Sequence, residues 1–474
     1  MFVRRFYDDD LAQASYLIGS PATGEAIVVD PNRDIEQYLA GARAEGLRIT
    51  HVSETHIHAD FVSGARALAA RTGATLLLSA EGGTDWQYAF AAADGATLLH
   101  DGDRFNVGTV RFEVMHTPGH TPEHIAFLVT NTAATEEPMA MVSGDFVFVG
   151  DVGRPDLLEK AARQVGTMVE GAKTLFRSLE RFRALPDHLQ VWPGHGAGSA
   201  CGKSLGAVPS TTVGYEKIAN WGVATTDEAT FVQGVLDGQP EPPAYFAIMK
   251  RVNRDGPPRE VHPLAVPALP ADSLGSALAN GSVVVDTRTV AAHAAGHVPG
   301  TINIPVNRSF ATWAGSLVPY DRDVLLIAAD EAAATRAVRA LVLIGLDRVT
   351  GWVPPGAVDA WSAAHGELST ARNVAVAEAR ELVDAGDAVI LDVRRQTEWE
   401  SGHVPGAVHI PLGDLPSRLA DLPGDREIVV HCQSGSRSAI AASVLRAAGR
   451  ADVRNLEGGI VAWRREQGPL TAAD

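Results

Sequence analysis

The sequence predicts a multidomain protein of mixed α/β and α+β class, and three observations support this prediction. Its composition is that of a globular protein, with 46% hydrophobic and 20% charged residues. At roughly 150 residues per domain, a chain of 474 residues corresponds to about three domains. Strands alternate with helices in the first half, and a segment of the second half is repeated. We therefore expect one α/β domain followed by two copies of a smaller one.

Composition also excludes several classes of function. A net charge of −17 argues against a nucleic-acid partner, because phosphate binding needs clustered lysines and arginines. No apolar stretch approaches the roughly 20 residues that cross a bilayer, and the first residues lack the apolar core of a signal peptide. Two cysteines, Cys201 and Cys432, cannot form a disulfide framework for this length. We expect a soluble, cytoplasmic protein without membrane contacts.

The first domain is expected over residues 1–245. Residues 15–19, 25–30 and 48–56 have the apolar character of strands. Residues 35–46 form an amphipathic helical pattern that ends at Gly46. Histidines, aspartates and glycines gather where strands end, which is typical of α/β domains whose loops carry the functional groups.

A proline-rich segment, residues 246–270, is interpreted as a linker with a packed turn around residues 245–253. The repeat follows it. Residues 283–306 and 389–412 both contain a strand, Asp, Arg, a short helix, Gly-His-Val-Pro-Gly and a further strand. Each copy then continues with a buried strand and a helix, and closes near a tryptophan. We expect two domains with boundaries at 271–368 and 369–474.

Potential metal ligands occur at four strand-to-loop junctions of the first domain. In an extended segment, residues two apart share a face, so the three polar residues of "THIHAD" converge. Further donors stand in "PGHT", "SGD" and "PGH". Such a series favours a metal site over histidines that only hydrogen-bond within loops. The candidate residues are His56, His58, Asp60, His120, Asp145 and His195.

These four motifs, in this order, resemble the metallo-β-lactamase fold, an αββα sandwich whose basic site holds two metals. The resemblance places a third histidine of the first motif on the second metal, but this sequence has Phe61 there. A phenyl ring has no lone pair to donate. One metal is therefore expected, and two-metal hydrolysis of the glyoxalase-II type is disfavoured because both ions clamp the reacting oxygens.

Among single-metal members, the sequence most resembles the persulfide dioxygenases. The resemblance implies one Fe(II) per chain, held by His56, His120 and Asp145, a facial triad that leaves coordination positions open. His58, Asp60 and His195 would then orient these ligands or bridge waters. With zinc as a substitute metal, His58 is an alternative ligand. His116 and His124 are expected to be structural or to support the ligands.

Two further residues of the first domain have two interpretations each. The family places the segment of Arg154 near the thiol-substrate pocket, where an Arg pairs with a carboxylate or phosphate. The alternative is a surface Arg in a helix-capping loop. Cys201 follows His195 by six residues among small and polar neighbours. It is interpreted as a redox-active or sulfur-carrying thiol at the mouth of the iron pocket, with a structural turn residue as the alternative.

The second chemical signal is "VVHCQSGSRS", in which a buried strand leads to Cys432 and then to a helix. Small residues allow backbone N–H groups to point at one spot, and Arg437 adds a positive charge. This environment stabilises a thiolate and binds oxyanions. The loop, with "LDVR" and "GHVPGAVHIP", resembles rhodanese more than the phosphatases that share its Cys-to-Arg spacing. The resemblance implies a Cys432 persulfide cradled by Gln433, Ser434, Gly435, Ser436 and Arg437.

The earlier copy lacks this chemistry. Ala328, give or take a residue, is expected opposite Cys432, and Asp330 and Glu331 replace the cradle with negative charge. We predict an inactive rhodanese domain that acts as a spacer or assembly surface.

Over the whole chain, the domain order resembles the bacterial multidomain persulfide dioxygenase–sulfurtransferases of sulfide detoxification. The implied substrates are a low-molecular-weight thiol persulfide, O2 and sulfite, and the implied product of sulfite is thiosulfate. The implied assembly is a homodimer or homotetramer. A metallohydrolase with an accessory sulfurtransferase and a non-enzymatic sulfur relay or sensor remain alternatives. Glutathione, coenzyme A, bacillithiol and cysteine all remain possible thiols.

Overall fold

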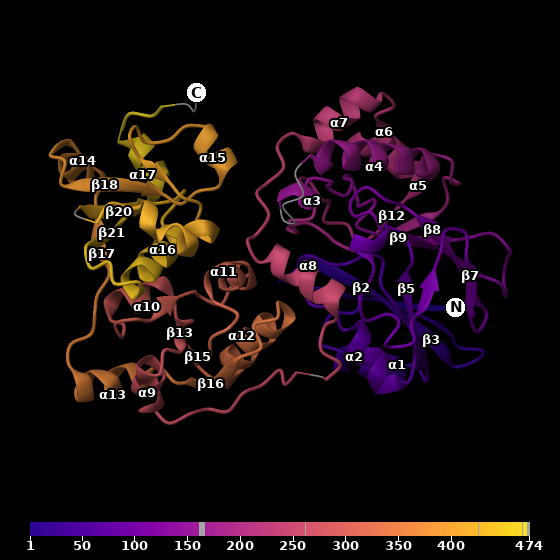
Figure 1. The fold of residues 1–474 in the computed structure, drawn as a ribbon, viewed down its shortest axis with the longest axis horizontal. Coiled ribbons are helices and arrows are strands. Elements are labelled where there is room, and N and C mark those ends of the chain that lie inside the picture. The colour runs from indigo at the N-terminus through magenta and orange to yellow at the C-terminus, as the bar shows by residue number, and fades with distance from the viewer. Residues whose placement is uncertain (161–165, 261, 425, 467, 472–474) are drawn as a thin grey trace. The chain divides into compact units, whose positions relative to one another are not determined.

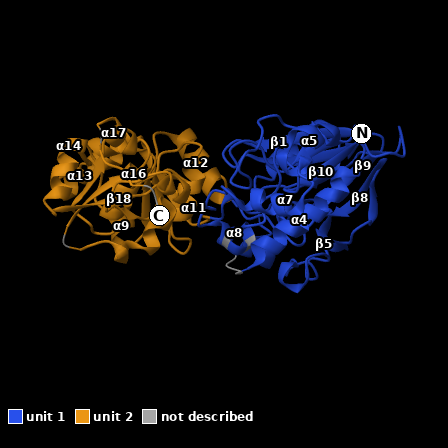
Figure 2. Ribbon diagram, turned by 90° about the horizontal axis from the view of Figure 1, so that it is seen from above, with its two compact units in different colours: residues 1–262, 343–345 blue, residues 263–342, 346–474 orange. Residues whose placement is uncertain are grey.

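The structure is a computed structural model that describes residues 1–160, 166–260, 262–424, 426–466 and 468–471. The chain divides into two compact units, which Figure 2 colours separately. Unit 1 comprises residues 1–262 and 343–345, and unit 2 comprises residues 263–342 and 346–474. None of the described helices is both long enough and apolar enough to cross a membrane.

Unit 1 contains two six-stranded sheets. The first has the order β1 (Phe2–Asp8), β2 (Gln13–Ser20), β3 (Glu25–Val29), β4 (Arg48–Ser53), β5 (Thr75–Ser79) and β6 (Thr97–Leu99). The second has the order β12 (Thr211–Thr212), β11 (Gln190–Pro193), β10 (Ala140–Gly144), β9 (Ile125–Asn131), β8 (Val110–His116) and β7 (Arg104–Val107). The helices are α1 (Glu36–Ala44), α2 (Ala65–Thr72), η1 (Thr84–Trp86), α3 (Leu157–Lys160), α4 (Thr167–Arg183), α5 (Val213–Ala219), α6 (Trp221–Ala224), α7 (Glu228–Leu236) and α8 (Phe246–Asp255).

The alternation of side chains along the strands produces four layers. In β2, Tyr16 and Ile18 join the core between the two sheets, whereas Leu17 joins the core beneath α1 and α2. On the other side of the unit, α4 and α7 pack on the second sheet. Figure 1 shows the sheets between α1 and α2 on one side and α4 to α7 on the other. The predicted αββα sandwich is confirmed.

The local predictions in this domain also hold. The strands expected at 15–19, 25–30 and 48–56 correspond to β2, β3 and β4. Helix α1 ends at Ala44, and Gly46 then adopts the left-handed conformation, with φ 66°. Glycine reaches this conformation without steric cost, and it directs the chain into β4.

The segment interpreted as a linker from residue 246 starts inside unit 1. Residues 246–262 belong to that unit, and α8 inserts Phe246 and Met249 among buried residues. Asn253 Nδ2 donates hydrogen bonds to the carbonyl oxygens of His58 and Phe61, at 2.8 and 2.7 Å. Its Oδ1 accepts the Ser63 N–H at 2.9 Å. Helix α8 therefore holds the loop that carries "THIHAD", which the proline content alone did not indicate.

Unit 2 contains two parallel sheets. The first has the order β14 (Ile302–Asn303), β13 (Val283–Asp286), β15 (Val324–Ile327) and β16 (Val349–Val353). The second has the order β17 (Arg372–Val374), β21 (Val453–Leu456), β20 (Glu427–His431), β18 (Ala388–Asp392) and β19 (Val408–His409). The helices are α9 (Ser273–Ala279), α10 (Val290–Ala295), α11 (Phe310–Leu317), α12 (Glu331–Leu343), α13 (Gly356–His365), α14 (Val376–Asp384), α15 (Gln396–Glu400), η2 (Leu412–Ser417), η3 (Leu419–Asp421), α16 (Ser436–Ala447) and α17 (Gly459–Arg465).

The internal repeat is confirmed at the level of strand register. Asp286 of β13 pairs with Ile327 of β15, and Asp392 of β18 pairs with His431 of β20. In both copies the residue that follows the central strand, Ala328 or Cys432, is buried. Each copy has its own hydrophobic core, so the duplication is structural as well as sequential.

Replacement of Asn253 by Ala is expected to destabilise unit 1. It leaves three buried backbone groups without partners, and each such group costs about 1–3 kcal/mol. We expect the urea midpoint of the transition of unit 1 to fall clearly, and the amides of residues 58–63 to exchange faster. The exposed Asn106, changed to Ala, is the control. An unchanged midpoint in N253A would contradict the role assigned to α8.

Candidate metal centre and sulfur-carrying loop

Three of the predicted metal ligands meet at the ends of strands of unit 1. His56 follows β4, His120 lies between β8 and β9, and Asp145 follows β10. Gly144 at the end of β10 has φ 52°, and a Cβ there would lie 2.5 Å from Thr55 Oγ1. Only glycine allows this approach, which brings Asp145 next to the segment of His56.

The three side chains form a compact donor set. Asp145 Oδ2 lies 3.8 Å from His56 Nε2 and 3.6 Å from His120 Nε2. All three residues are buried, and Asp145 Oδ2 has no hydrogen-bond partner among the described residues. An unpartnered carboxylate oxygen that faces two imidazole nitrogens fits a metal ion with nitrogen and oxygen ligands.

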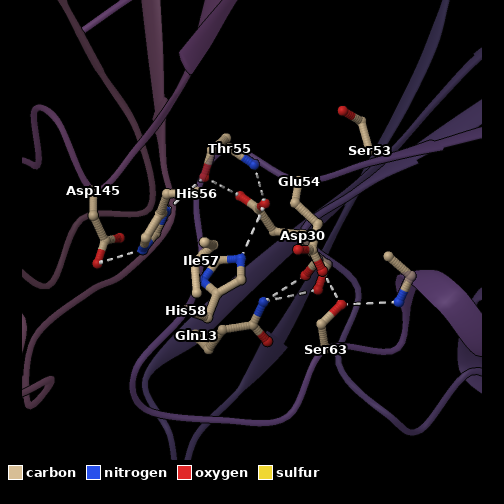
Figure 3. Close-up of polar contacts among 12 residues, drawn as sticks. Gln13, Asp30, Ser53, Glu54, Thr55, His56, Ile57, His58, Ser63 and Asp145 are labelled. Atoms are coloured by element: carbon tan, nitrogen blue, oxygen red, sulfur yellow. Dashed lines mark hydrogen bonds and ion pairs between the residues drawn. The ribbon is translucent and has the colours of Figure 1, made fainter. Parts of the chain in front are cut away.

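Hydrogen bonds fix which nitrogen of each ring is free. Thr55 Oγ1 donates to Asp30 Oδ2 at 2.9 Å, so it accepts from His56 Nδ1, also at 2.9 Å. His120 Nδ1 donates to the Arg154 carbonyl oxygen at 3.2 Å. In both rings the proton is on Nδ1, and the Nε2 lone pair faces Asp145. Figure 3 shows the chain of contacts from Asp30 through Thr55 to His56.

The protonation equilibria agree with this arrangement. Burial, and then neighbouring positive charge, lower the pKa of His56 well below its usual value, and burial lowers that of His120. Burial alone would raise the pKa of Asp145, but His195 and the other histidines hold it well below its usual value. The site therefore offers two neutral imidazoles and a charged carboxylate near neutral pH.

His58 faces a different partner. Its Nε2 lies 3.2 Å from Asp30 Oδ1 (Figure 3). Burial opposes protonation, but Asp30 raises the pKa of His58 to about 9. His58 Nδ1 has no described partner, and the ring lies outside the compact donor set. Phe61 is fully buried, with its ring centroid 4.4 Å from that of His58. An apolar ring thus occupies the place beside this histidine.

A second donor group adjoins the first. His195 Nδ1 contacts Asp145 Oδ1 at 2.7 Å, and its Nε2 contacts Asp60 Oδ2 at 2.8 Å. Asp60, His195 and Cys201 place their donor atoms within 4.8 Å of one another. Cys201 is buried rather than open to solvent, and burial together with Asp145 and Asp60 raises the pKa of its thiol well above the usual value. Cys201 thus belongs to the interior of the site and is held protonated.

Neither interpretation of Arg154 agrees with the structure. The side chain is fully buried and forms an ion pair with Asp156, with contacts of 2.8 and 2.6 Å. Two further N–H groups donate to the carbonyl oxygens of Ala200 and Pro240, at 3.0 and 2.7 Å. Four of the five N–H groups of Arg154 thus have internal partners, and the residue is not on the surface. Arg154 instead connects the loop of Cys201 to the carbonyl group that orients His120.

The two other histidines near the site have structural contacts, as expected. His124 Nδ1 contacts Thr117 Oγ1 at 2.8 Å, and its Nε2 accepts the Asp145 N–H at 3.0 Å. His116 Nε2 donates to the Pro122 carbonyl oxygen at 2.8 Å. Asp30 was not predicted from the sequence, although it lies at a strand end, as the predicted ligands do.

The loop after β20 forms the expected cradle around Cys432. Sγ accepts the Gly435 N–H at 3.2 Å and lies 3.5 Å from Ser438 Oγ. Burial opposes ionisation, but hydrogen bonds from Ser438, Gly435 and Ser434 lower the pKa of the Cys432 thiol. Gly435, with φ 109°, is the N-cap of α16, so the helix N-terminus adds to this stabilisation of the thiolate. Gln433 and Ser436 complete the loop.

The Arg437 side chain is paired with a residue of the same domain. Its guanidinium forms two hydrogen bonds with Glu398, at 2.6 and 2.7 Å, which fasten α15 to the start of α16. Across the loop, Ile460 N donates to the Cys432 carbonyl oxygen at 2.9 Å, and a Cβ on Gly459 would lie 2.5 Å from that oxygen. Glu398 and Gly459 were not predicted because they lie outside the motif and are distant in sequence from their partners. Ser438 ends the motif, but no role was predicted for it.

The first copy has no such cradle. Ala328 takes the place of Cys432, and Asp330 Oδ1 accepts the Ala333 N–H at 2.7 Å, which caps α12. This copy nevertheless lines the pocket beside Arg437. A cavity of about 520 Å³ is bordered by Asn307 and Trp313 of the first copy and by Arg395, Glu398 and Arg437 of the second.

Comparisons with known proteins agree with this architecture. The metallo-β-lactamase superfamily matches residues 8–195, and the rhodanese-like domain family matches residues 270–364 and 375–466. A solved metallo-β-lactamase from Staphylococcus aureus subsp. aureus COL is 42% identical, with a TM-score of 0.67. That similarity covers 75% of this chain and 99% of the other. The chain belongs to the metallo-β-lactamase superfamily.

Two curated relatives match separate parts of this metallo-β-lactamase superfamily protein. A sulfurtransferase from Allochromatium vinosum is 37% identical over 95 residues, which is 20% of this chain and 89% of that protein. A hydroxyacylglutathione hydrolase from Polaromonas sp. is 37% identical over 182 residues, which is 38% of this chain and 61% of that enzyme. The chain spans 54% of the length of the β-lactamase hydrolase-like proteins of Xylella fastidiosa that it also matches.

The metal centre predicts a specific loss on mutation. In His120→Ala the donor set loses one imidazole, and we expect the metal content after dialysis to fall at least tenfold, measured by mass spectrometry of the elements. His116→Ala, which alters a histidine outside the donor set, is expected to retain its metal. Equal metal contents in the two variants, with unchanged circular dichroism, would exclude the proposed ligand.

The two cysteines are expected to differ in reactivity. Native protein treated with iodoacetamide should be alkylated at Cys432 and not at Cys201, as read by peptide mass spectrometry. The rate at Cys432 should reach half its maximum at a pH below that of an ordinary thiol, since its pKa is lowered. Ser438→Ala should move this midpoint upward, and the exposed Ser417→Ala should not. Preferential alkylation of Cys201 would contradict the structure.

Proposed function

We propose that unit 1 is an Fe(II)-dependent persulfide dioxygenase and that the second rhodanese-like domain is a sulfurtransferase that produces thiosulfate. The observation that carries the proposal is the donor set of His56, His120 and Asp145, with Phe61 where a further histidine ligand is expected. The first reaction converts RSSH, O2 and H2O to RSH, sulfite and two protons. In the second, sulfite takes the sulfane sulfur of a Cys432 persulfide, which gives thiosulfate and the Cys432 thiolate.

Bound Fe(II) would supply open coordination positions at which a persulfide sulfur and O2 are brought together. The protein's own contribution is to hold the ligands in the required form. Thr55 and the Arg154 carbonyl keep the protons on Nδ1 of His56 and His120. His195 binds Asp145 Oδ1 and so directs Oδ2 toward the two imidazoles. Phe61 keeps water and a second cation away from His58.

The sulfur-transfer step depends on the charge of Cys432. The thiolate attacks the terminal sulfur of a persulfide donor, the donor S–S bond breaks, and the thiol leaves with the proton. The N–H groups that lower the pKa of the thiol also stabilise the anionic persulfide that results. Sulfite then attacks the terminal sulfur, and the electron pair of the broken S–S bond returns to Cys432. The step needs no external oxidant.

The two activities are expected to separate by mutation. Addition of a glutathione persulfide to iron-reconstituted protein should cause O2 uptake and release thiosulfate. His120→Ala should abolish O2 uptake while sulfur transfer from persulfide to added sulfite continues. Cys432→Ser should retain O2 uptake and accumulate sulfite. Absence of O2 uptake in the iron-loaded wild type would reject the dioxygenase and would leave a sulfur relay or sensor. Repeating the assay with persulfides of coenzyme A, bacillithiol and cysteine identifies the thiol.

A metallohydrolase of the thioesterase class is the second candidate. Asp60, His195 and Cys201 are the observation that favours it, because together they form a donor group beside the first one. The similarity to a hydroxyacylglutathione hydrolase over residues of unit 1 agrees with it. Two zinc ions per chain, with thioester hydrolysis and no O2 uptake, would select this function. The raised pKa of Cys201 opposes it, because a thiol must lose its proton to bind zinc.

A further inference from the structure

Unit 2 contains a second cleft, at the opposite end of α16 from Cys432. It has a volume of about 480 Å³ and lies between the two rhodanese-like domains. Three arginines line it, Arg372, Arg446 and Arg450, together with His297, Ser369 and Thr370. None of its described lining residues is an aspartate or a glutamate. In a chain with a net charge of −17, a cleft with three guanidinium groups and no carboxylate is unusual.

The three guanidinium charges are not neutralised within the described residues. Arg446 donates to the Val453 carbonyl oxygen at 2.6 Å. Arg450 donates to the Pro423 and Leu422 carbonyl oxygens, at 2.8 and 3.0 Å. The exposed side chain of Arg372 has no hydrogen-bond or ion-pair partner in the described part of the chain. Carbonyl oxygens hold the side chains of Arg446 and Arg450 in place without cancelling their charge.

The positive charge of the cleft lowers the pKa of neighbouring basic groups. Burial, and then Arg372, lower the pKa of Arg446. The His297 ring stacks on His293 at 3.9 Å, and burial lowers the pKa of both rings, with Arg446 lowering them further. The buried carboxylate of Asp286, whose charge acts on His297, is already paired with Arg288 at 2.6 Å. The positive charge of the cleft is therefore not balanced by a carboxylate among the described lining residues.

We propose that this cleft binds a phosphorylated small molecule. Guanidinium groups pair with phosphate oxygens through two parallel hydrogen bonds, and three of them around one cavity suit a di- or triphosphate. The volume exceeds what a single sulfur oxyanion fills, and Ser369 and Thr370 add hydroxyl groups at its edge.

The site is separate from the sulfur-carrying loop. Ser436 begins α16 beside Cys432, and Arg446 is ten residues later on the same helix. At 1.5 Å per residue the two ends are about 15 Å apart along the axis. A ligand in the cleft thus does not compete directly for Cys432, and α16 connects the two places.

Calorimetric titration of the full-length protein with inorganic diphosphate and with ADP, at fixed ionic strength, tests the proposal. We expect binding by the wild type and at least tenfold weaker binding by Arg372→Glu. The matched control is Arg380→Glu, which makes the same charge change at an exposed position of α14. Because the Arg372 side chain has no hydrogen-bond or ion-pair partner among the described residues, its replacement should leave the thermal unfolding temperature unchanged. Cys432→Ser should bind as the wild type does.

Four outcomes would overturn the proposal. Absence of binding by the wild type at millimolar diphosphate and ADP would reject a phosphate site, and equal weakening by the two charge reversals would reduce the effect to general electrostatics. Loss of binding in Cys432→Ser would place the ligand at the sulfur-carrying loop. Tighter Arg372-dependent binding of thiosulfate than of diphosphate would make the cleft a sulfur-oxyanion site. Because neither titrant involves O2 or a persulfide, failure here leaves the proposed function unaffected.

Discussion

The carboxylate of Asp145 is fully buried, and its two oxygens face different partners. A buried charge is costly unless it is paired, and here the pairing is with His195 on one side and with a metal, once bound, on the other. The left-handed turn at Gly144 places this carboxylate, and His124 receives its N–H. His56, His120 and His195 all face this one carboxylate, which also contributes to the raised pKa of the Cys201 thiol.

The chain uses its two cysteines in opposite electrostatic environments. Cys432 is surrounded by N–H donors at the start of a helix, which favour the thiolate. Cys201 is surrounded by carboxylates, which favour the thiol. Both side chains are buried, so exposure does not distinguish them. The sign of the local potential does, because it lowers the pKa of the Cys432 thiol and raises that of the Cys201 thiol.

The duplicated domain shows how a copy without a nucleophile retains a place in the structure. Ala328 and Asp330 have replaced the cradle with a helix cap, yet the same copy supplies one wall of the cavity beside Arg437. It also supplies His297 to the arginine-lined cleft. The first copy is therefore part of the surroundings of α16 at both ends.

The sequence by itself determined the α/β organisation of the first domain, the repeated domains, the candidate ligands at strand ends and the cradle of Cys432, because side-chain alternation, turn residues and short motifs are local. The αββα sandwich and the choice of His56, His120 and Asp145 were implied by the resemblance of its motifs to known families. Tertiary structure decided the rest. Arg154 has a structural role because its guanidinium group donates hydrogen bonds to Asp156, Ala200 and Pro240. Glu398 binds Arg437 from 39 residues away, and Asn253 reaches the metal loop from 195 residues away. Such partners are chosen by packing, because a buried polar group accepts whichever complementary group the fold brings within hydrogen-bond distance, and no spacing in the sequence records that choice.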